Sequence, residues 1–193
     1  PIIGAPSESV GELKLLSIDL AGQVTILRQG ANDPLFSPDG KHLLYRRSLK
    51  DTLGLTVLNL ATSEERFLAP ELEINTEFVE WSPDGKQIVV NPYFSTIYLV
   101  SFETGSYEVF AEEGEAPAWS PDGTKIAFIR REAIVLKDVL GGNESIYTAT
   151  PERLLYVQWI NQDQLRFWSD KDGKSKQYLI RLTKGTFEQI CQV

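Results

Sequence analysis

The stretch Trp81-Ser82-Pro83-Asp84-Gly85-Lys86 decides the fold of this chain, because it recurs along the sequence. An earlier copy at 36–41 reads Phe-Ser-Pro-Asp-Gly-Lys, and a later copy at 119–124 reads Trp-Ser-Pro-Asp-Gly-Thr. The serines stand at positions 37, 82 and 120, which gives spacings of 45 and 38 residues. A weaker fourth copy begins at Trp159. Repeats of roughly 40 residues that contain several short strands are typical of propeller blades.

Each copy has the residue types of a tight turn between two strands. Proline presets φ for the first turn position, aspartate can bond to its own backbone, and glycine supplies the positive φ that ends the turn. Segments rich in β-branched, leucine or aromatic residues follow the turns at 41–48, 87–94 and 125–131. One large aromatic residue precedes each turn, and we expect it to pack one blade against the next: Phe36, Trp81, Trp119 and Trp159.

The rest of each repeat contains two further strand segments, so each repeat predicts a four-stranded antiparallel blade. These strands are expected at 55–60 and 65–68, 96–102 and 107–110, 133–139 and 145–148, and 177–182 and 187–191. Segments at 13–20 and 23–28 match half a blade, and residues 1–11 form a tail or a partial strand. The prediction is an all-β propeller of four full blades plus an N-terminal half blade. It forms one domain over 1–193, with repeats at about 12–30, 34–69, 76–112, 115–149 and 153–193.

Composition excludes several classes of protein. The net charge is -8, and lysines and arginines cluster only at the pairs 46–47 and 130–131, so we expect no nucleic-acid binding. No stretch approaches the roughly 20 apolar residues of a membrane span. The single cysteine, Cys191, can form neither an internal disulfide nor a metal cluster, and no cofactor is expected. The chain begins at Pro1 without any methionine, which indicates a processed product or a piece of a longer chain; a removed export signal is one explanation.

The sequence contains no recognisable catalytic set. Asp39, Asp84 and Asp122 occupy equivalent turns one repeat apart, so we interpret them as turn formers and not as a converging site. His42 is the only histidine, and any Ser-His-Asp or Cys-His site would need it. It begins a strand where other repeats carry plain polar residues, which favours a surface histidine. A glycosidase pair among the scattered carboxylates stays an open alternative without a motif, and we predict that the chain is not an enzyme.

A partner surface is predicted where propeller loops gather. Loops between blades and loops joining the second and third strands of a blade share one face, and binding residues concentrate on such loops. That face is acidic and carries two aromatic residues, so it suits a protein or peptide partner. Alternatively, Tyr93 or Phe94 ends a strand and packs on a neighbouring blade. The candidate partner-binding residues are Tyr93, Phe94, Glu71, Glu73, Glu112, Glu113, Glu115 and Arg130.

The aromatic-Ser-Pro-Asp-Gly turns, with the strand that follows each, resemble the repeat of TolB-type propellers. The resemblance covers the chain from about Glu12 to its end. It implies a propeller that commonly has six or seven blades and serves as an interaction platform in the bacterial envelope, as in the Tol–Pal system. Related propellers guide substrates in peptidases, so a non-catalytic part of a larger enzyme is the alternative function. We therefore expect a periplasmic or otherwise extracytoplasmic protein.

The number of blades is smaller than is usual in these propellers. Four and a half blades predict a small ring of five units, an open fragment, or a ring completed by a second chain as a homodimer. An open sheet edge promotes association, because its backbone groups are unpaired.

Overall fold

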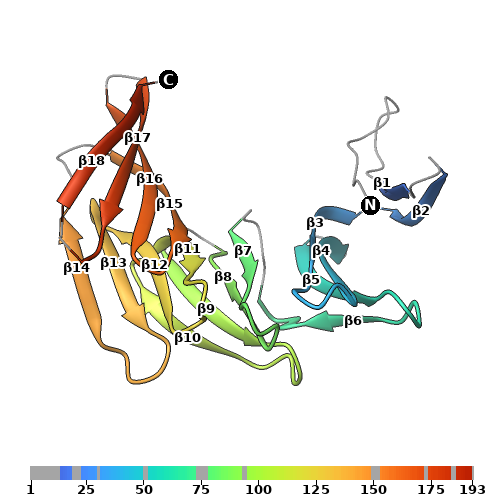
Figure 1. Ribbon diagram of the computed structural model, residues 1–193. Coiled ribbons are helices and arrows are strands. Elements are labelled where there is room, and N and C mark those ends of the chain that lie inside the picture. Colours follow the sequence, from blue (N-terminus) through green and yellow to red (C-terminus); the bar gives the residue numbers. More distant parts are fainter. Residues whose placement is uncertain are drawn as a thin grey trace. The chain divides into compact units, whose positions relative to one another are not determined.

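The computed structural model describes residues 14–18, 23–29, 31–49, 52–72, 78–92, 95–148, 153–171, 174–183 and 186–192 (Figure 1). Every regular element in these ranges is a β-strand. The chain divides into two units, residues 1–77 and 78–193. Among the residues that the structure describes, no helix is long and apolar enough to cross a membrane.

The first unit contains a two-stranded and a four-stranded sheet, both antiparallel. The pair is formed by β1 (Lys14–Ile18) and β2 (Val24–Gln29). The four-stranded sheet has the order β3-β4-β5-β6. Its strands are β3 (Ala31–Phe36), β4 (His42–Leu49), β5 (Thr52–Asn59) and β6 (Glu65–Leu68).

The second unit contains three four-stranded antiparallel sheets in which the strands follow chain order. The first sheet holds β7 (Val79–Trp81), β8 (Gln87–Val90), β9 (Thr96–Ser101) and β10 (Tyr107–Glu112). The second holds β11 (Glu115–Trp119), β12 (Lys125–Arg130), β13 (Ala133–Asp138) and β14 (Glu144–Thr148). The third holds β15 (Arg153–Asn161), β16 (Gln164–Lys171), β17 (Lys174–Arg181) and β18 (Thr186–Gln192).

Four four-stranded sheets and one two-stranded pair confirm the prediction of four blades and a half blade. The strand predicted at 87–94 is wrong in length, because β8 ends at Val90. Pro92 has no backbone N–H for a ladder, and Asn91 directs its side-chain amide to other backbone carbonyls. The strand predicted at 55–60 begins earlier, at Thr52, and includes Gly54. Glycine disfavours the interior of a strand, so the sequence predicted a later start.

The repeated turn has the hydrogen bonds that its sequence predicts. In the second copy, Ser82 Oγ donates to Asp84 Oδ1 at 2.7 Å, and the Lys86 amide donates to the same oxygen at 3.0 Å. The Gly85 amide donates to the Ser82 carbonyl at 2.9 Å, and Gly85 has a φ of +71°. The copies at Ser37 and Ser120 have the same serine–aspartate bond. The aspartates therefore form turns, as predicted.

Apolar side chains fill the spaces between successive sheets of the second unit. Trp119 is 5% exposed and lies in a core with Val89 and Leu99 of the preceding sheet. Trp159 packs against the core that joins the last two sheets, and its Nε1 donates to the Ala118 carbonyl at 3.1 Å. The predicted packing of one sheet against the next is confirmed for these two tryptophans. The side chain of Phe36 is more exposed than that of Trp119, at 36%.

Candidate functional site

Three connections of the second unit meet at one end of its first two sheets. The side-chain amide of Asn91 donates to the carbonyl of Thr96 at 3.0 Å and to that of Gly114 at 3.1 Å. The Gly114 amide donates in turn to the Ser95 carbonyl at 3.1 Å. Asn91 is fully buried, and its side chain joins the loop after β8 to the connection from β10 to β11. These are a loop between the second and third strands of a blade and a connection between blades, the two classes of loop that were expected on one face.

The turn between β12 and β13 belongs to the same end. Arg131 in this turn forms an ion pair of 2.6 Å with Glu113 in the β10–β11 connection. Both side chains are exposed, so solvent screens the pair and it contributes little stability. The pair nevertheless shows that the two connections are neighbours. We use the name loop face for residues 111–115 and 130–132.

Four non-glycine residues at or beside the loop face have a left-handed backbone. The φ angles are 52° at Glu113, 50° at Ala116, 48° at Arg131 and 65° at Glu132. Such conformations are uncommon for residues with a Cβ atom, and they gather at functional sites more often than elsewhere. The surrounding contacts hold this part of the backbone in a specific shape.

A hollow of about 600 Å³ opens beside the loop face, between β10 and the β12–β13 hairpin. Lys137 lines it. The Lys137 Nζ donates to the Phe110 carbonyl at 2.6 Å and lies 4.9 Å from the centre of the Phe110 ring. Arg130 makes two bonds to Glu144, of 2.7 and 3.2 Å, and this guanidinium lowers the pKa of the Glu144 carboxyl. The hollow is lined by Val109, Phe110, Ala111, Glu112, Glu113, Arg130, Arg131 and Lys137.

The structure brings together part of the predicted partner surface. Glu112, Glu113 and Arg130 line the hollow, and the exposed Glu115 begins β11 at its edge. Glu71 is exposed in the first unit. Tyr93, Phe94 and Glu73 lie outside the described residues, so their role stays a prediction.

The sequence analysis named Arg130 but missed Lys137, which also lines the hollow, and Glu144, which pairs with both. Lys137 and Glu144 stand in strands and carry no motif. Only the register, which places Lys137 opposite Glu144, brings them to Arg130.

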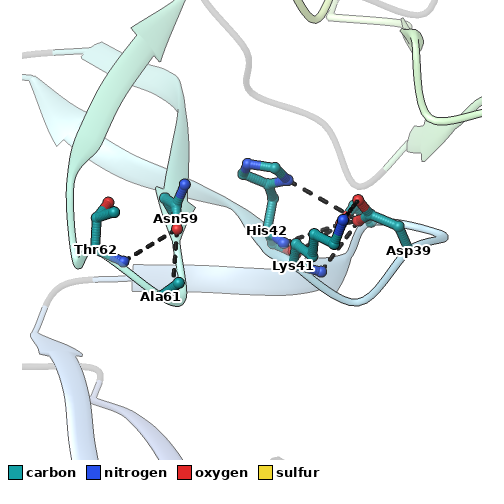
Figure 2. Close-up of polar contacts among 7 residues, drawn as sticks. Asp39, Lys41, His42, Asn59, Ala61 and Thr62 are labelled. Atoms are coloured by element: carbon teal, nitrogen blue, oxygen red, sulfur yellow. Dashed lines mark hydrogen bonds and ion pairs between the residues drawn. The ribbon is translucent and has the colours of Figure 1, made fainter.

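His42 lies in the first unit beside the turn of Asp39 (Figure 2). Its Nδ1 is 3.9 Å from Asp39 Oδ1, and its side chain is mostly covered at the wall of a second hollow of about 380 Å³. Ser37 is nearby, but its hydroxyl donates to Asp39 and accepts the backbone amide of His42. The three residue types of a Ser-His-Asp triad are thus present, yet their bonds build a turn and leave no serine–imidazole bond.

Asn59 also lines this second hollow, and its side chain forms a turn. Asn59 Oδ1 accepts the backbone amides of Ala61 at 2.9 Å and Thr62 at 3.1 Å (Figure 2). Within the described ranges, no group of three or more histidine, cysteine, aspartate or glutamate side chains is placed to hold a metal ion.

Comparison with known proteins identifies the fold. No family model and no curated protein sequence matches this chain significantly. Among solved structures, TolB from Acinetobacter baumannii aligns with a TM-score of 0.70 and 22% identity over 90% of this chain and 47% of that one. A putative TolB from Agrobacterium tumefaciens aligns with a TM-score of 0.68 and 21% identity, over 89% of this chain and 66% of that one.

Enzymes share the same architecture. A puromycin-hydrolysing peptidase from Mycobacterium tuberculosis aligns with a TM-score of 0.73 and 16% identity, over 93% of this chain and 33% of that one. The chain therefore spans less than two thirds of the length of each of these proteins. At such identities the similarity establishes fold and leaves activity open. The chain has a TolB-like β-propeller fold, composed of four four-stranded blades and a half blade.

Proposed function

We propose that this chain is a non-catalytic interaction module that binds a basic protein or peptide segment through the loop face. The observation that carries the proposal is the hollow beside a left-handed backbone, with carboxylates on its rim. Arg131 is matched by Glu113 and Arg130 by Glu144. Within the described part of the chain, no ion pair is found for the exposed Glu112, Glu115 or Glu132. These carboxylates leave a local excess of negative charge that favours a cationic partner.

The hollow offers an apolar contact beside this charge. This contact is Val109, which is half exposed; Phe110 is buried, with its ring beneath the Lys137 ammonium. A lysine or arginine of the partner can place its aliphatic stem on this surface and its charge near the glutamates.

Matched charge-reversal variants test the proposal. The first variant changes Glu112, Glu115 and Glu132 to lysine. The control changes the exposed Glu64, Glu103 and Asp163 to lysine, which alters the net charge equally at residues that are not part of the loop face. Both are compared with the unchanged chain in affinity capture from the envelope and soluble fractions of the source cell, and the captured partner is then titrated at several salt concentrations.

A partner retained by the control and lost by the loop-face variant, with an affinity that falls as salt rises, is the expected result. Equal retention by the two variants would exclude the loop face. The same fractions test the compartment, because we also propose that the protein is extracytoplasmic, by similarity to the TolB fold. Detection of the chain in the soluble cytoplasmic fraction alone would contradict that part.

A propeller domain within a larger enzyme is the second candidate. The alignment with 33% of the Mycobacterium tuberculosis peptidase favours it, since the chain there corresponds to one part of a catalytic protein. In that case the loop face would guide a substrate to catalytic residues outside this sequence. A longer native reading frame that encodes a catalytic domain would support this candidate, and purified full-length protein without hydrolase activity would count against it.

A further inference from the structure

The last sheet of the second unit has an outer face that differs chemically from the equivalent faces of the sheets before it. The inner face of this sheet carries Leu165, Phe167, Tyr178 and Ile180, which pack into the core shared with the preceding sheet. Strand pairing places the alternate side chains on the other side. We use the name outer face for these six residues: Tyr156, Gln158, Arg166, Trp168, Gln177 and Leu179.

Equivalent positions in the preceding sheets are aliphatic and buried. In the sheet β11–β14 the central positions are Ala127, Ile129, Ile134 and Leu136, all in the core that contacts the last sheet. In the sheet β7–β10, Val89, Ile97 and Leu99 contact the next sheet in the same way. The last sheet instead has arginine, tryptophan and glutamine at three of the four corresponding central positions, and the buried Leu179 at the fourth. This composition suits a polar interface with an aromatic centre better than the dry packing of one blade on another.

Arg166 is the one cation among the six outer-face residues, and its guanidinium has few hydrogen-bond partners. Its Nη2 donates to Gln158 Oε1 at 2.6 Å, and its guanidinium carbon lies 4.7 Å from the centre of the Trp168 ring. Its Nε is buried without an acceptor, and no carboxylate within the described ranges forms an ion pair with it. Arg130 in the preceding sheet, by contrast, has two bonds to Glu144. A guanidinium that lies beside an aromatic ring and lacks a carboxylate partner can donate a charge-assisted hydrogen bond to one.

Aromatic surface continues beside this guanidinium. Tyr156 is 51% exposed and meets the Trp168 ring edge to face, with centroids 6.4 Å apart. Its ring also lies 5.8 Å from that of Phe78. Ile160, further along β15, is 48% exposed. Exposed aromatic and aliphatic surface around an arginine is the usual composition of a binding hot spot.

The charge of the last sheet complements an acidic partner. Residues 153–193 contain 7 lysines and arginines against 4 aspartates and glutamates, whereas residues 1–152 contain 12 against 23. Arg153 and Arg181 stand in the same alternation as Arg166; the acidic residues that the described register places in it are Asp170, opposite Arg153, and Glu188, opposite Leu179. The acidic remainder of the protein would repel an acidic ligand, so this sheet is where such a ligand is favoured.

We propose that the outer face binds an extended, acidic segment of a partner polypeptide, with a carboxylate on Arg166 and a neighbouring apolar side chain on Trp168 and Tyr156. This site is separate from the loop face and does not depend on it. An extended segment fits because its alternate side chains point to one side, as do those of the strands below it.

A blocked seven-residue peptide that alternates glutamate with leucine is the probe, and the same peptide with glutamine in place of glutamate is its control. Binding to the full chain is measured by titration calorimetry. We expect the glutamate peptide to bind about tenfold or more tightly than the glutamine peptide, because a charge-assisted bond to arginine is lost in the control. Equal affinities for the two peptides would overturn the proposal.

Three variants locate the site. Arg166→Gln removes the cation, and Gln158→Glu places a carboxylate where Arg166 already donates, so the guanidinium is neutralised without loss of side-chain volume. Both should abolish the preference for the glutamate peptide. Lys86→Gln removes an exposed cation in the β7–β8 turn, outside both proposed surfaces; it is the control and should leave the preference unchanged.

Thermal unfolding of each variant separates loss of binding from loss of fold. Gln158→Glu is the decisive variant, since it keeps the chain length of the side chain and gains an ion pair. A folded Gln158→Glu chain that still discriminates between the peptides contradicts the proposal. So does a chain that is dimeric by light scattering and becomes monomeric in Arg166→Gln, because the outer face would then bind a second copy.

Discussion

The carboxylate of Glu80 lies 3.0 Å from the backbone nitrogen of Trp119 and joins two neighbouring sheets. Glu80 is on β7 and Trp119 on β11, the first strand of the next sheet. The free edge of a first strand has unpaired N–H groups, and a buried N–H without an acceptor is costly. Burial raises the pKa of the Glu80 carboxyl, and the Trp119 amide opposes part of this effect.

Replacement of this carboxyl by an amide should stabilise the protein at neutral pH. The folded-state pKa of Glu80 is above its ordinary value of 4.5, so its favourable contribution is complete below 4.5 and is lost as pH rises through the folded-state pKa. Glu80→Gln keeps an acceptor for Trp119 and removes the buried charge. We expect its free energy of unfolding to exceed that of the unchanged chain at pH 7, with a difference that shrinks toward pH 4.5. Urea unfolding at both pH values measures it, and a constant difference would contradict the prediction.

Asp122 should have the opposite pH dependence. The backbone amide of Thr124 lowers the pKa of the Asp122 carboxyl, with the Ser120 hydroxyl as a further donor. Its stabilising contribution is therefore present above the ordinary value of 3.8 and is lost as pH falls through the lowered folded-state pKa. In Asp122→Asn this loss should be absent. Unfolding curves collected from neutral pH to below 3.8 test the prediction, which fails if both chains lose stability in parallel.

Gly114 should tolerate no side chain. A Cβ atom there would lie 2.6 Å from Cδ1 of Ile97 and 3.0 Å from Cδ2 of Phe128, both in the buried core. Gly114→Ala should cost about 1–3 kcal/mol of unfolding free energy through overpacking. The double variant Gly114→Ala with Ile97→Val removes the nearest atom and should recover part of that cost. Additive losses in chemical denaturation would show that the clash is not the cause.

The indole of Trp159 should contribute to blade packing through its N–H as well as its volume. Its Nε1 donates to the Ala118 carbonyl of the preceding sheet at 3.1 Å. Trp159→Phe retains an aromatic ring and leaves this carbonyl without its donor, at a cost of about 1 kcal/mol. Thermal unfolding measures it. Tyr156→Phe, which retains the ring of an exposed side chain in the same strand, is the control and should be close to neutral.

The Glu113–Arg131 pair should affect binding more than stability. Both side chains are exposed, and exposed pairs contribute about 0–1 kcal/mol. Glu113→Gln should therefore leave the unfolding midpoint nearly unchanged and alter the affinity for the loop-face partner. A marked loss of stability would show that the pair holds the β10–β11 connection in place.

The repeated turn is the part of the structure that the sequence by itself determined. Serine, proline, aspartate and glycine act within six residues, so their bonds depend on local chain geometry and recur wherever the motif occurs. The spacing of the motif and the strand segments between its copies were enough to predict the number of blades. Where a local signal was misleading, as for the strand predicted to reach Phe94, a proline and a long-range asparagine bond decided the end.

The two surfaces proposed to bind partners were decided only by the tertiary structure. Arg130 and Glu144 are adjacent because of strand register, and the Arg131–Glu113 pair depends on two connections that meet in space. The outer face of the last sheet likewise consists of alternate residues from three strands, among them Tyr156, Arg166 and Leu179. Charge and aromatic content can be counted in the sequence. Their convergence depends on pairing between segments far apart in the chain, and no local pattern encodes it.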